Sequence, residues 1–303
     1  MFALLFAAVL SGCAAPKPDS PEACALVRRG AFQLTFLRVV GTVPVTLDGI
    51  TATMLFDTGA NGVVVGRSAA ERLKLLGNGN VRILSQGLGG ETRAFPAGVG
   101  RIDMGGAALV NQHVVVLPFD VRGFGEPPPE GLLGMDFLSN FDTEVDLRSG
   151  AGVLYQARNC PSARPGWAEA SNGLRIPPES GSGKLLVETE LDGQKFVALL
   201  DTGAEGSIVS KRAARRLGIT DEVLSHDRAV VGHGIAETDA QMRMHRFASL
   251  RFGAEEIRSP VLAVADLPSV AEDMLLGMNY MRGRKLWISP SSRRVFLSAP
   301  VLP

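Results

Sequence analysis

The residues of this chain that could do chemistry are two aspartates, Asp57 and Asp201, each of which opens the tetrapeptide Asp-Thr-Gly-Ala. Two carboxylates held in contact cannot easily both ionise, so the pair keeps one shared proton over a range of acidic pH. The ionised member can take a proton from water, while the protonated member hydrogen-bonds the carbonyl oxygen of the group under attack. Such a pair would hydrolyse an amide with no metal, cofactor or covalent intermediate.

Each aspartate is expected on a tight loop between two β-strands. Both copies of the motif stand between apolar runs with strand character, which are residues 50–56, 62–65, 196–200 and 207–209. Gly59 and Gly203, two residues after the aspartates, supply the turn.

The motif is part of a longer internal repeat. Three further landmarks recur in the second half of the chain at nearly the same spacing: residues 69–73 match 213–217, residues 87–90 match 232–235, and residues 132–136 match 275–279. Landmarks in register indicate a duplication rather than a coincidence of short motifs.

At residues 31–298 the chain resembles the retropepsin-like aspartic proteases, with both lobes joined in one polypeptide. The resemblance rests on the doubled Asp-Thr-Gly and on the later Leu-Leu-Gly of each half, at residues 132–134 and 275–277. It implies an all-β fold in which two homologous β-barrel lobes form an intramolecular pseudo-dimer with the active-site cleft between them.

The domain limits follow from the repeat and from composition. We expect a lipoprotein-type signal and tether at 1–29, a first lobe at 30–155, a linker at 156–183 and a second lobe at 184–303. The linker prediction rests on four prolines and a Gly-Ser-Gly run between the two copies.

The resemblance also implies roles for individual residues. Asp57 and Asp201 would be catalytic, and the threonines and glycines that follow them would support the site, with Thr58 and Thr202 hydrogen-bonding across the lobe interface. The remaining expectations are flap residues Gly87, Gly89, Gly90, Gly232, His233 and Gly234, and the substrate-binding residues Asn61 and Glu205.

The alanines after the motifs bear on pH. Pepsin-like relatives usually carry Ser or Thr where Ala60 and Ala204 stand, and a hydroxyl there can hydrogen-bond the charged carboxylate and lower its pKa. Alanine removes that bond, so we expect the pair to work best in mildly acidic conditions, on the order of pH 4 to 6.5.

Other chemistries lack support in the sequence. Lys and Arg number 31 and Asp and Glu number 31, so no overall field favours nucleic acid. No serine-hydrolase, zinc-protease or phosphate-binding motif is present, and the four histidines have no metal-ligand spacing. We expect no cofactor and no metal.

The N-terminal residues indicate export. An apolar run at residues 2–10, too short to span a bilayer, ends in Leu-Ser-Gly-Cys13, which resembles a lipobox with Cys13 as the lipidated residue. We expect an exported, periplasm-facing protein held on a bacterial membrane by a lipid anchor. No Lys or Arg precedes Cys13, so either the true start lies upstream or the signal is degenerate. An ordinary secretory signal and a fortuitous apolar start remain alternatives.

The other cysteines, Cys24 and Cys160, lie outside both repeats. In an oxidising compartment they could form a disulfide, and the alternative is two unpaired thiols.

These observations together predict a monomeric aspartic endopeptidase that acts on peptides or proteins. One alternative is a catalytically silent peptide-binding module that keeps the fold, although retention of both aspartates favours an enzyme. Another is a protease whose lobes pair between chains, which the intact doubling makes unnecessary.

Overall fold

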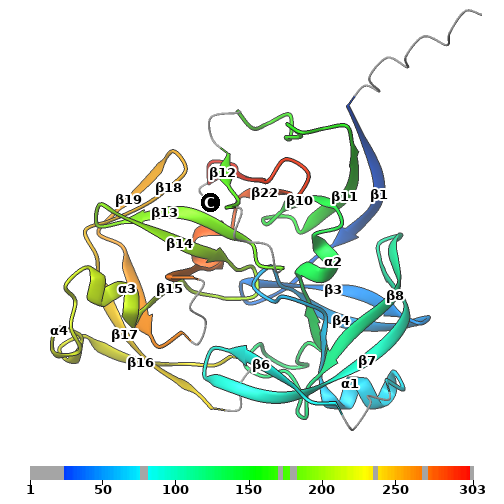
Figure 1. Ribbon diagram of the computed structural model, residues 1–303, viewed down its shortest axis with the longest axis horizontal. Helices are drawn as coiled ribbons and strands as arrows, with labels where there is room; N and C mark the ends of the chain where they lie inside the picture. Colours follow the sequence, from blue (N-terminus) through cyan, green and yellow to red (C-terminus); the bar gives the residue numbers. More distant parts are fainter. Residues whose placement is uncertain are drawn as a thin grey trace, which may run out of the picture.

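The computed structural model describes residues 24–75, 81–169, 173–177, 183–234, 238–267 and 272–300. These residues form two β-rich lobes joined by a third sheet (Figure 1), so the expectation of an all-β, two-lobed fold is confirmed. Among the described residues no helix is long and apolar enough to cross a membrane. Cys13 lies outside the described residues.

The first lobe is an eight-stranded sheet in the order β2-β3-β4-β9-β5-β8-β7-β6, which curls so that β3 also pairs with β7. Its strands are β2 (Thr35–Leu37), β3 (Val40–Leu47), β4 (Ile50–Phe56), β5 (Val64–Val65), β6 (Ile83–Gly87), β7 (Gly90–Met104), β8 (Ala107–Val116) and β9 (Gly131–Leu133). Val43, Val45 and Leu47 alternate along β3 and are at most 1% exposed, which explains why this segment is a strand facing a core.

The second lobe repeats this arrangement in a nine-stranded sheet with the order β16-β17-β20-β15-β21-β14-β13-β18-β19. Its strands are β13 (Leu186–Leu191), β14 (Gln194–Leu200), β15 (Ile208–Ser210), β16 (Arg228–Gly232), β17 (Ala240–Arg246), β18 (Ser249–Phe252), β19 (Glu255–Arg258), β20 (Val261–Ala265) and β21 (Met274–Leu276). In both lobes the strand before the motif pairs in parallel with the Leu-Leu strand, β4 with β9 and β14 with β21.

A six-stranded sheet joins the lobes in the order β1-β11-β10-β22-β23-β12. Its strands are β1 (Ala25–Gln33), β10 (Asp142–Asp146), β11 (Ala151–Arg158), β12 (Leu174–Arg175), β22 (Lys285–Ser289) and β23 (Arg294–Leu297). β10 of the first half pairs with β22 of the second, with Thr143 opposite Ile288. Main-chain hydrogen bonds therefore hold the two lobes together.

The described residues include five short helices, of which four follow a strand of a lobe and one follows another helix. They are α1 (Arg67–Arg72), α2 (Met135–Leu138), α3 (Lys211–Arg216), α4 (Asp221–Ser225) and α5 (Met278–Met281). α3 begins at Ser210, whose hydroxyl accepts a hydrogen bond from the amide of Ala213 at 3.0 Å. α2 and α5 directly follow the Leu-Leu-Gly of each lobe, so they complete the segment behind each catalytic loop.

The ends of the predicted segments differ from the structure. Residues 25–29, expected in the tether, form the first part of β1, and residues 156–183, expected as linker, include the end of β11 and all of β12. β1 pairs with β11 along its length, with Ala25 opposite Arg158. These pairings join segments far apart in the sequence, so local composition did not show them.

A disulfide joins the N-terminal strand to the end of β11. The sulfur atoms of Cys24 and Cys160 lie 2.11 Å apart, across a sequence separation of 136 residues. Since Cys24 directly precedes β1, the bond adds a covalent link to the pairing of β1 with β11.

Candidate active site

Asp57 and Asp201 each begin the loop that follows a central strand, β4 and β14. The amide of Asp57 donates to the carbonyl oxygen of Leu133 at 3.1 Å, and the amide of Asp201 donates to that of Leu276 at 2.9 Å. The Leu-Leu strand therefore sets where each aspartate leaves its sheet.

The glycine after each Leu-Leu pair braces the catalytic loop from behind. A Cβ atom at Gly134 would lie 2.3 Å from the carbonyl oxygen of Gly62, and one at Gly277 would lie 2.4 Å from that of Gly206. Such approaches exclude any side chain, so only glycine lets the two segments pack this closely. The residue after this glycine also contacts the catalytic loop, since the amide of Met135 donates to the carbonyl of Ala60 at 2.9 Å.

Thr58 and Thr202 link the two loops by reciprocal hydrogen bonds. The hydroxyl of Thr58 donates to the carbonyl of Leu200 at 2.6 Å and accepts from the amide of Thr202 at 3.1 Å. The hydroxyl of Thr202 donates to the carbonyl of Phe56 at 2.6 Å and accepts from the amide of Thr58 at 3.1 Å. Both side chains are at most 2% exposed, so this network fixes the distance between the loops in a place that water does not reach.

The two aspartates face each other across the lobe boundary, each against the glycine of the other loop. A Cβ atom at Gly59 would lie 2.3 Å from Cγ of Asp201, and a Cβ atom at Gly203 would lie 2.6 Å from Cγ of Asp57. Within its own loop, Oδ1 of Asp57 accepts from the amide of Gly59 at 2.9 Å, and Oδ1 of Asp201 accepts from that of Gly203 at 2.8 Å. The four groups form one compact carboxylate site.

The surroundings move the pKa of both aspartates in the same direction. Burial raises the pKa of Asp57, and hydrogen bonds from the Asp201 carboxyl and from two loop amides partly offset that rise. Burial together with the negative charge of Asp57 raises the pKa of Asp201 well above its usual range. The two carboxyls therefore share a proton under acidic conditions.

The aspartates lie at the floor of a cleft of about 750 Å³ between the lobes. Two hairpins reach over this cleft, β6–β7 from the first lobe and β16–β17 from the second, and their tips approach each other at the bottom of Figure 1. The hydroxyl of Thr238 donates to the carbonyl of Gly89, which joins the two tips. The hairpins are thus in position to cover a bound chain.

The residues expected in the flaps lie at these tips. Gly87 and Gly90 close the first hairpin, and Gly89 between them has a φ of 96°, which favours glycine. Gly232, His233 and Gly234 line the cleft at the end of β16. Nδ1 of His233 lies 2.8 Å from Oδ1 of Asp239 and its side chain is exposed, so this histidine belongs to the flap and not to the aspartate pair.

Asn61 and Glu205, the expected substrate-binding residues, both line the cleft but differ in their contacts. Oε2 of Glu205 forms an ion pair with Arg38 at 2.9 Å. Oε1 of Glu205 is buried and has no hydrogen-bond partner among the residues that the structure describes. Asn61 has a neutral side chain, and Gly183 lies close to its main-chain carbonyl, 3.1 Å from which a Cβ atom on that glycine would stand. The two sides of the cleft are therefore chemically unequal.

Several cleft residues were not predicted from the sequence. Arg38 reaches Glu205 from the other lobe, and Lys184 forms an ion pair with Glu272 at 2.8 Å in the cleft wall. The apolar wall residues Met242 and Met244 were also missed. Each of these residues gains its role from a partner far along the chain, and no local motif marks it.

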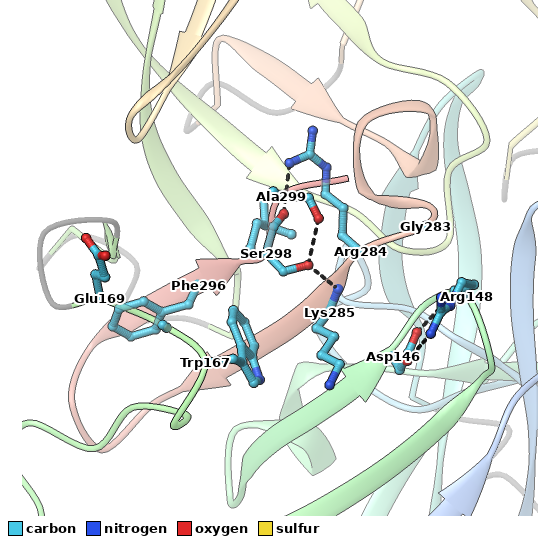
Figure 2. Close-up of a pocket in the computed structure, with 12 residues that line it drawn as sticks. Asp146, Arg148, Trp167, Glu169, Gly283, Arg284, Lys285, Phe296, Ser298 and Ala299 are labelled. Atoms are coloured by element: carbon cyan, nitrogen blue, oxygen red, sulfur yellow. Dashed lines mark hydrogen bonds and ion pairs between the residues drawn. The ribbon is translucent and has the colours of Figure 1, made fainter. Parts of the chain in front are cut away.

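A second concavity of about 390 Å³ lies on the outer face of the joining sheet and shares no residue with the cleft. Figure 2 shows Trp167 and Phe296 on one side of it, with Lys285 and the Asp146–Arg148 ion pair on the other. Of the described residues that line it, Asp146 and Glu169 carry carboxylates, and Figure 2 shows them on opposite sides and not as a pair. In the described parts of the chain, no group of three or more His, Cys, Asp or Glu residues could hold a metal ion.

Comparison with protein families agrees with this geometry. Residues 43–137 match the family described as "Aspartyl protease", and residues 187–283 match the family described as "gag-polyprotein putative aspartyl protease". No curated protein matches the chain significantly. The chain therefore belongs to the retropepsin-like aspartyl proteases, as a tandem form with one family domain in each lobe.

Proposed function

We propose that this protein is an aspartic endopeptidase that hydrolyses peptide bonds with a water molecule activated by Asp57 and Asp201. The observation that carries the proposal is the packing of each carboxylate against the glycine of the opposite loop. Two aspartates so placed share a proton and can divide the roles of acid and base.

The surroundings of the two carboxyls support a division of roles. In the proposed division of roles Asp201, the pKa of which is raised by burial and by the charge of Asp57, holds the shared proton at the start and hydrogen-bonds the carbonyl oxygen of the scissile bond. Asp57 starts as the charged member and takes a proton from the attacking water. Amides of its own loop, from Gly59 and Ala60 at 2.9 and 3.0 Å, favour its charged form, and the equivalent loop amides act on Asp201 in the same way. As the water oxygen bonds to the carbonyl carbon, Asp57 takes one proton from the water and Asp201 gives its proton to the carbonyl oxygen, so the pair still holds one proton. When the C–N bond breaks, Asp57 protonates the leaving nitrogen and Asp201 takes a proton back from a hydroxyl of the tetrahedral carbon.

The substrate in this proposal is an extended stretch of peptide or protein. An extended chain presents its backbone groups along both edges, and the flap hairpins lie over the cleft where those groups would pass. In this proposal the carboxylate of Glu205, which lines the cleft, would accept a backbone N–H of the substrate. Asn61 would serve the same purpose on the other side with a neutral side chain.

The site of action in this proposal is the outside of a bacterial membrane, where a lipid on Cys13 would hold a monomer. Support comes from the lipobox-like residues before Cys13 and from the Cys24–Cys160 disulfide, which suits an oxidising compartment. Expressed from its true start, the protein should partition into detergent, and Cys13→Ala should leave it soluble or unprocessed. Equal partitioning of both forms would exclude the anchor.

Incubation with an unstructured polypeptide tests the proposed activity. An endopeptidase releases fragments in molar excess over itself, and the rate should follow the amount of protein added. A silent peptide-binding module would give only a stoichiometric complex with intact polypeptide, and that result would overturn the proposal.

A further inference from the structure

The two lobes line the cleft with corresponding strands, so their walls can be compared position by position. In the first lobe Val64 of β5 pairs with Val115 of β8, and in the second lobe Ile208 of β15 pairs with Ala263 of β20. Val115 and Ala263 are therefore equivalent, and both line the cleft. At this position the second lobe has the smaller side chain.

The next position on the same face of the wall shows the same difference. Two residues further along, the first lobe has Leu117 and the second lobe has Ala265, which are 1% and 0% exposed. Leu117 lines the cleft. Ala265 lies in one apolar cluster with Ile208 and Ala263, so the second lobe has the smaller side chain at two successive positions of this strand.

On the neighbouring strand the difference is reversed. Pro96 of β7 and Met244 of β17 pair with the Val115 and Ala263 positions, respectively. Two residues before Pro96 the first lobe has Ala94, which is fully buried, and two residues before Met244 the second lobe has Met242. Both methionines line the cleft. The second lobe thus has a wall of two long, unbranched side chains where the first has Pro and Ala.

At these positions of the second lobe the long side chains pack against the small ones, in a cluster separate from the main core. We call it the methionine pocket; it consists of Leu88, Ile208, Met242, Met244, Ala263, Ala265, Leu267 and Leu275. The first-lobe counterparts Val64, Val115 and Leu117 belong to the main core instead. Methionine adapts its shape to what it contacts, whereas β-branched residues tied into a core hold one rotamer.

The first-lobe side is narrowed further by the segment after β8. Residues 117–130, which are more numerous than the corresponding residues 266–273 of the second lobe, bring Phe119, Val121 and Phe124 to the cleft. This segment is held against α1, because both the amide and the hydroxyl of Ser68 donate to the Asp120 carboxylate at 2.7 Å.

We propose that the methionine pocket is the principal specificity subsite and accepts a long apolar side chain such as Met, Leu or Phe, while the equivalent first-lobe subsite accepts a smaller one. The inference rests on the proposed function. The lobes are related by an approximate twofold with the aspartate pair between them, so the two subsites bind substrate positions on opposite sides of the scissile bond. Leu88, at the tip of the first flap, forms the roof of the methionine pocket.

Cleavage of a random peptide library, with products sequenced by mass spectrometry, tests this inference. Ala263→Val fills the second-lobe subsite and should lower kcat/KM for peptides with a long apolar residue on one side of the bond by roughly tenfold or more. The matched change Val115→Ala opens the first-lobe subsite and should admit larger residues on the other side only. Met244→Leu keeps the volume of the wall but reduces its adaptability, so it should narrow the range accepted on the same side as Ala263→Val.

The possible results separate this inference from the proposed function. If wild-type protein leaves the library intact, the proposed endopeptidase activity fails. If wild-type protein cleaves but Ala263→Val and Val115→Ala alter the same side, or neither side, the assignment of the subsites is wrong. Should Ala263→Val fail to fold, the other two variants still test the inference. It predicts that Val115→Ala and Met244→Leu change the preference on opposite sides of the bond, and a change on the same side would contradict it.

Discussion

Gly59 of the first lobe lies against the carboxylate of Asp201 in the second, so close that a Cβ atom on the glycine would be 2.3 Å from Cγ of the aspartate. Gly203 has the same relation to Asp57. The glycine of each Asp-Thr-Gly therefore does more than turn its own loop. It leaves the space that the other lobe's carboxylate occupies.

Gly59→Ala should abolish most activity without unfolding the protein. The added methyl group must displace the Asp201 carboxylate, and a misplacement of about 1 Å can cost roughly 100-fold in rate. Gly98→Ala is the matched control, because a Cβ atom there meets nothing within 4 Å. Rates on one peptide and circular dichroism spectra of both variants check this, and a Gly59→Ala enzyme as active as Gly98→Ala would contradict it.

Thr58→Ala should destabilise the protein and lower kcat. It removes a hydroxyl that serves the carbonyl of Leu200 and the amide of Thr202, and each buried group left unpaired costs about 1–3 kcal/mol. Thr58→Ser keeps the hydroxyl and should retain most of the stability. Denaturant unfolding of the two variants provides the comparison, and equal midpoints would show that the hydroxyl network does not hold the loops together.

Asp201→Asn should change how stability depends on pH. Because the folded-state pKa of Asp201 is raised, its contribution to stability is fully present below the unfolded value of about 3.9 and is lost as pH rises through the folded value. The variant lacks this loss, so the difference between its melting temperature and that of wild type should grow as pH rises. A difference of about 1 kcal/mol in the free energy of unfolding corresponds to about 2–4 °C in melting temperature. Parallel melting curves from pH 4 to pH 8 would contradict the raised pKa.

Ala60→Ser and Ala204→Ser together should move the acidic limb of the rate profile downward. On the acidic limb the rate falls because Asp57 also becomes protonated. The pKa of Asp57 is raised, so this fall should occur at a higher pH than for an ordinary aspartate, and wild-type activity should be greatest at about pH 4 to 6.5. An added hydroxyl favours the charged carboxylate and so lowers that pKa. A wild-type maximum below about pH 3, or an unmoved limb in the folded double variant, would show that the missing hydroxyls do not set it.

The features predictable from the sequence are those written in local, repeated signals. The doubled Asp-Thr-Gly at Asp57 and Asp201 and the Leu-Leu-Gly segments are short and in register, so the two-lobed fold could be recognised. The pairing of Thr143 with Ile288 could not be predicted, because no local sequence pattern encodes the register of two strands that are 145 residues apart. Local composition predicted a tether and a linker at segments that in the structure include β1 and β12, which pair with strands far along the chain.

The inequality of the two sides of the cleft was only partly predictable. Asn61 and Glu205 occupy equivalent motif positions, so their difference is visible by aligning the halves. The ion pair of Glu205 with Arg38 depends on a side chain that crosses from the other lobe. Met244 and Ala263 become neighbours only through the pairing of β17 with β20, so their joint effect on the cleft is a property of the folded sheet.

The central claim, that Asp57 and Asp201 of one chain form a single catalytic pair, is tested most directly by cleavage of an unstructured polypeptide by Asp57→Asn, Asp201→Asn and an equimolar mixture of the two. The account predicts folded proteins with no cleavage above background in all three samples, because no chain in the mixture holds both carboxyls. Wild-type-like cleavage by either single variant would contradict the shared pair. Recovery of activity on mixing would show instead that lobes of different chains combine to form the site.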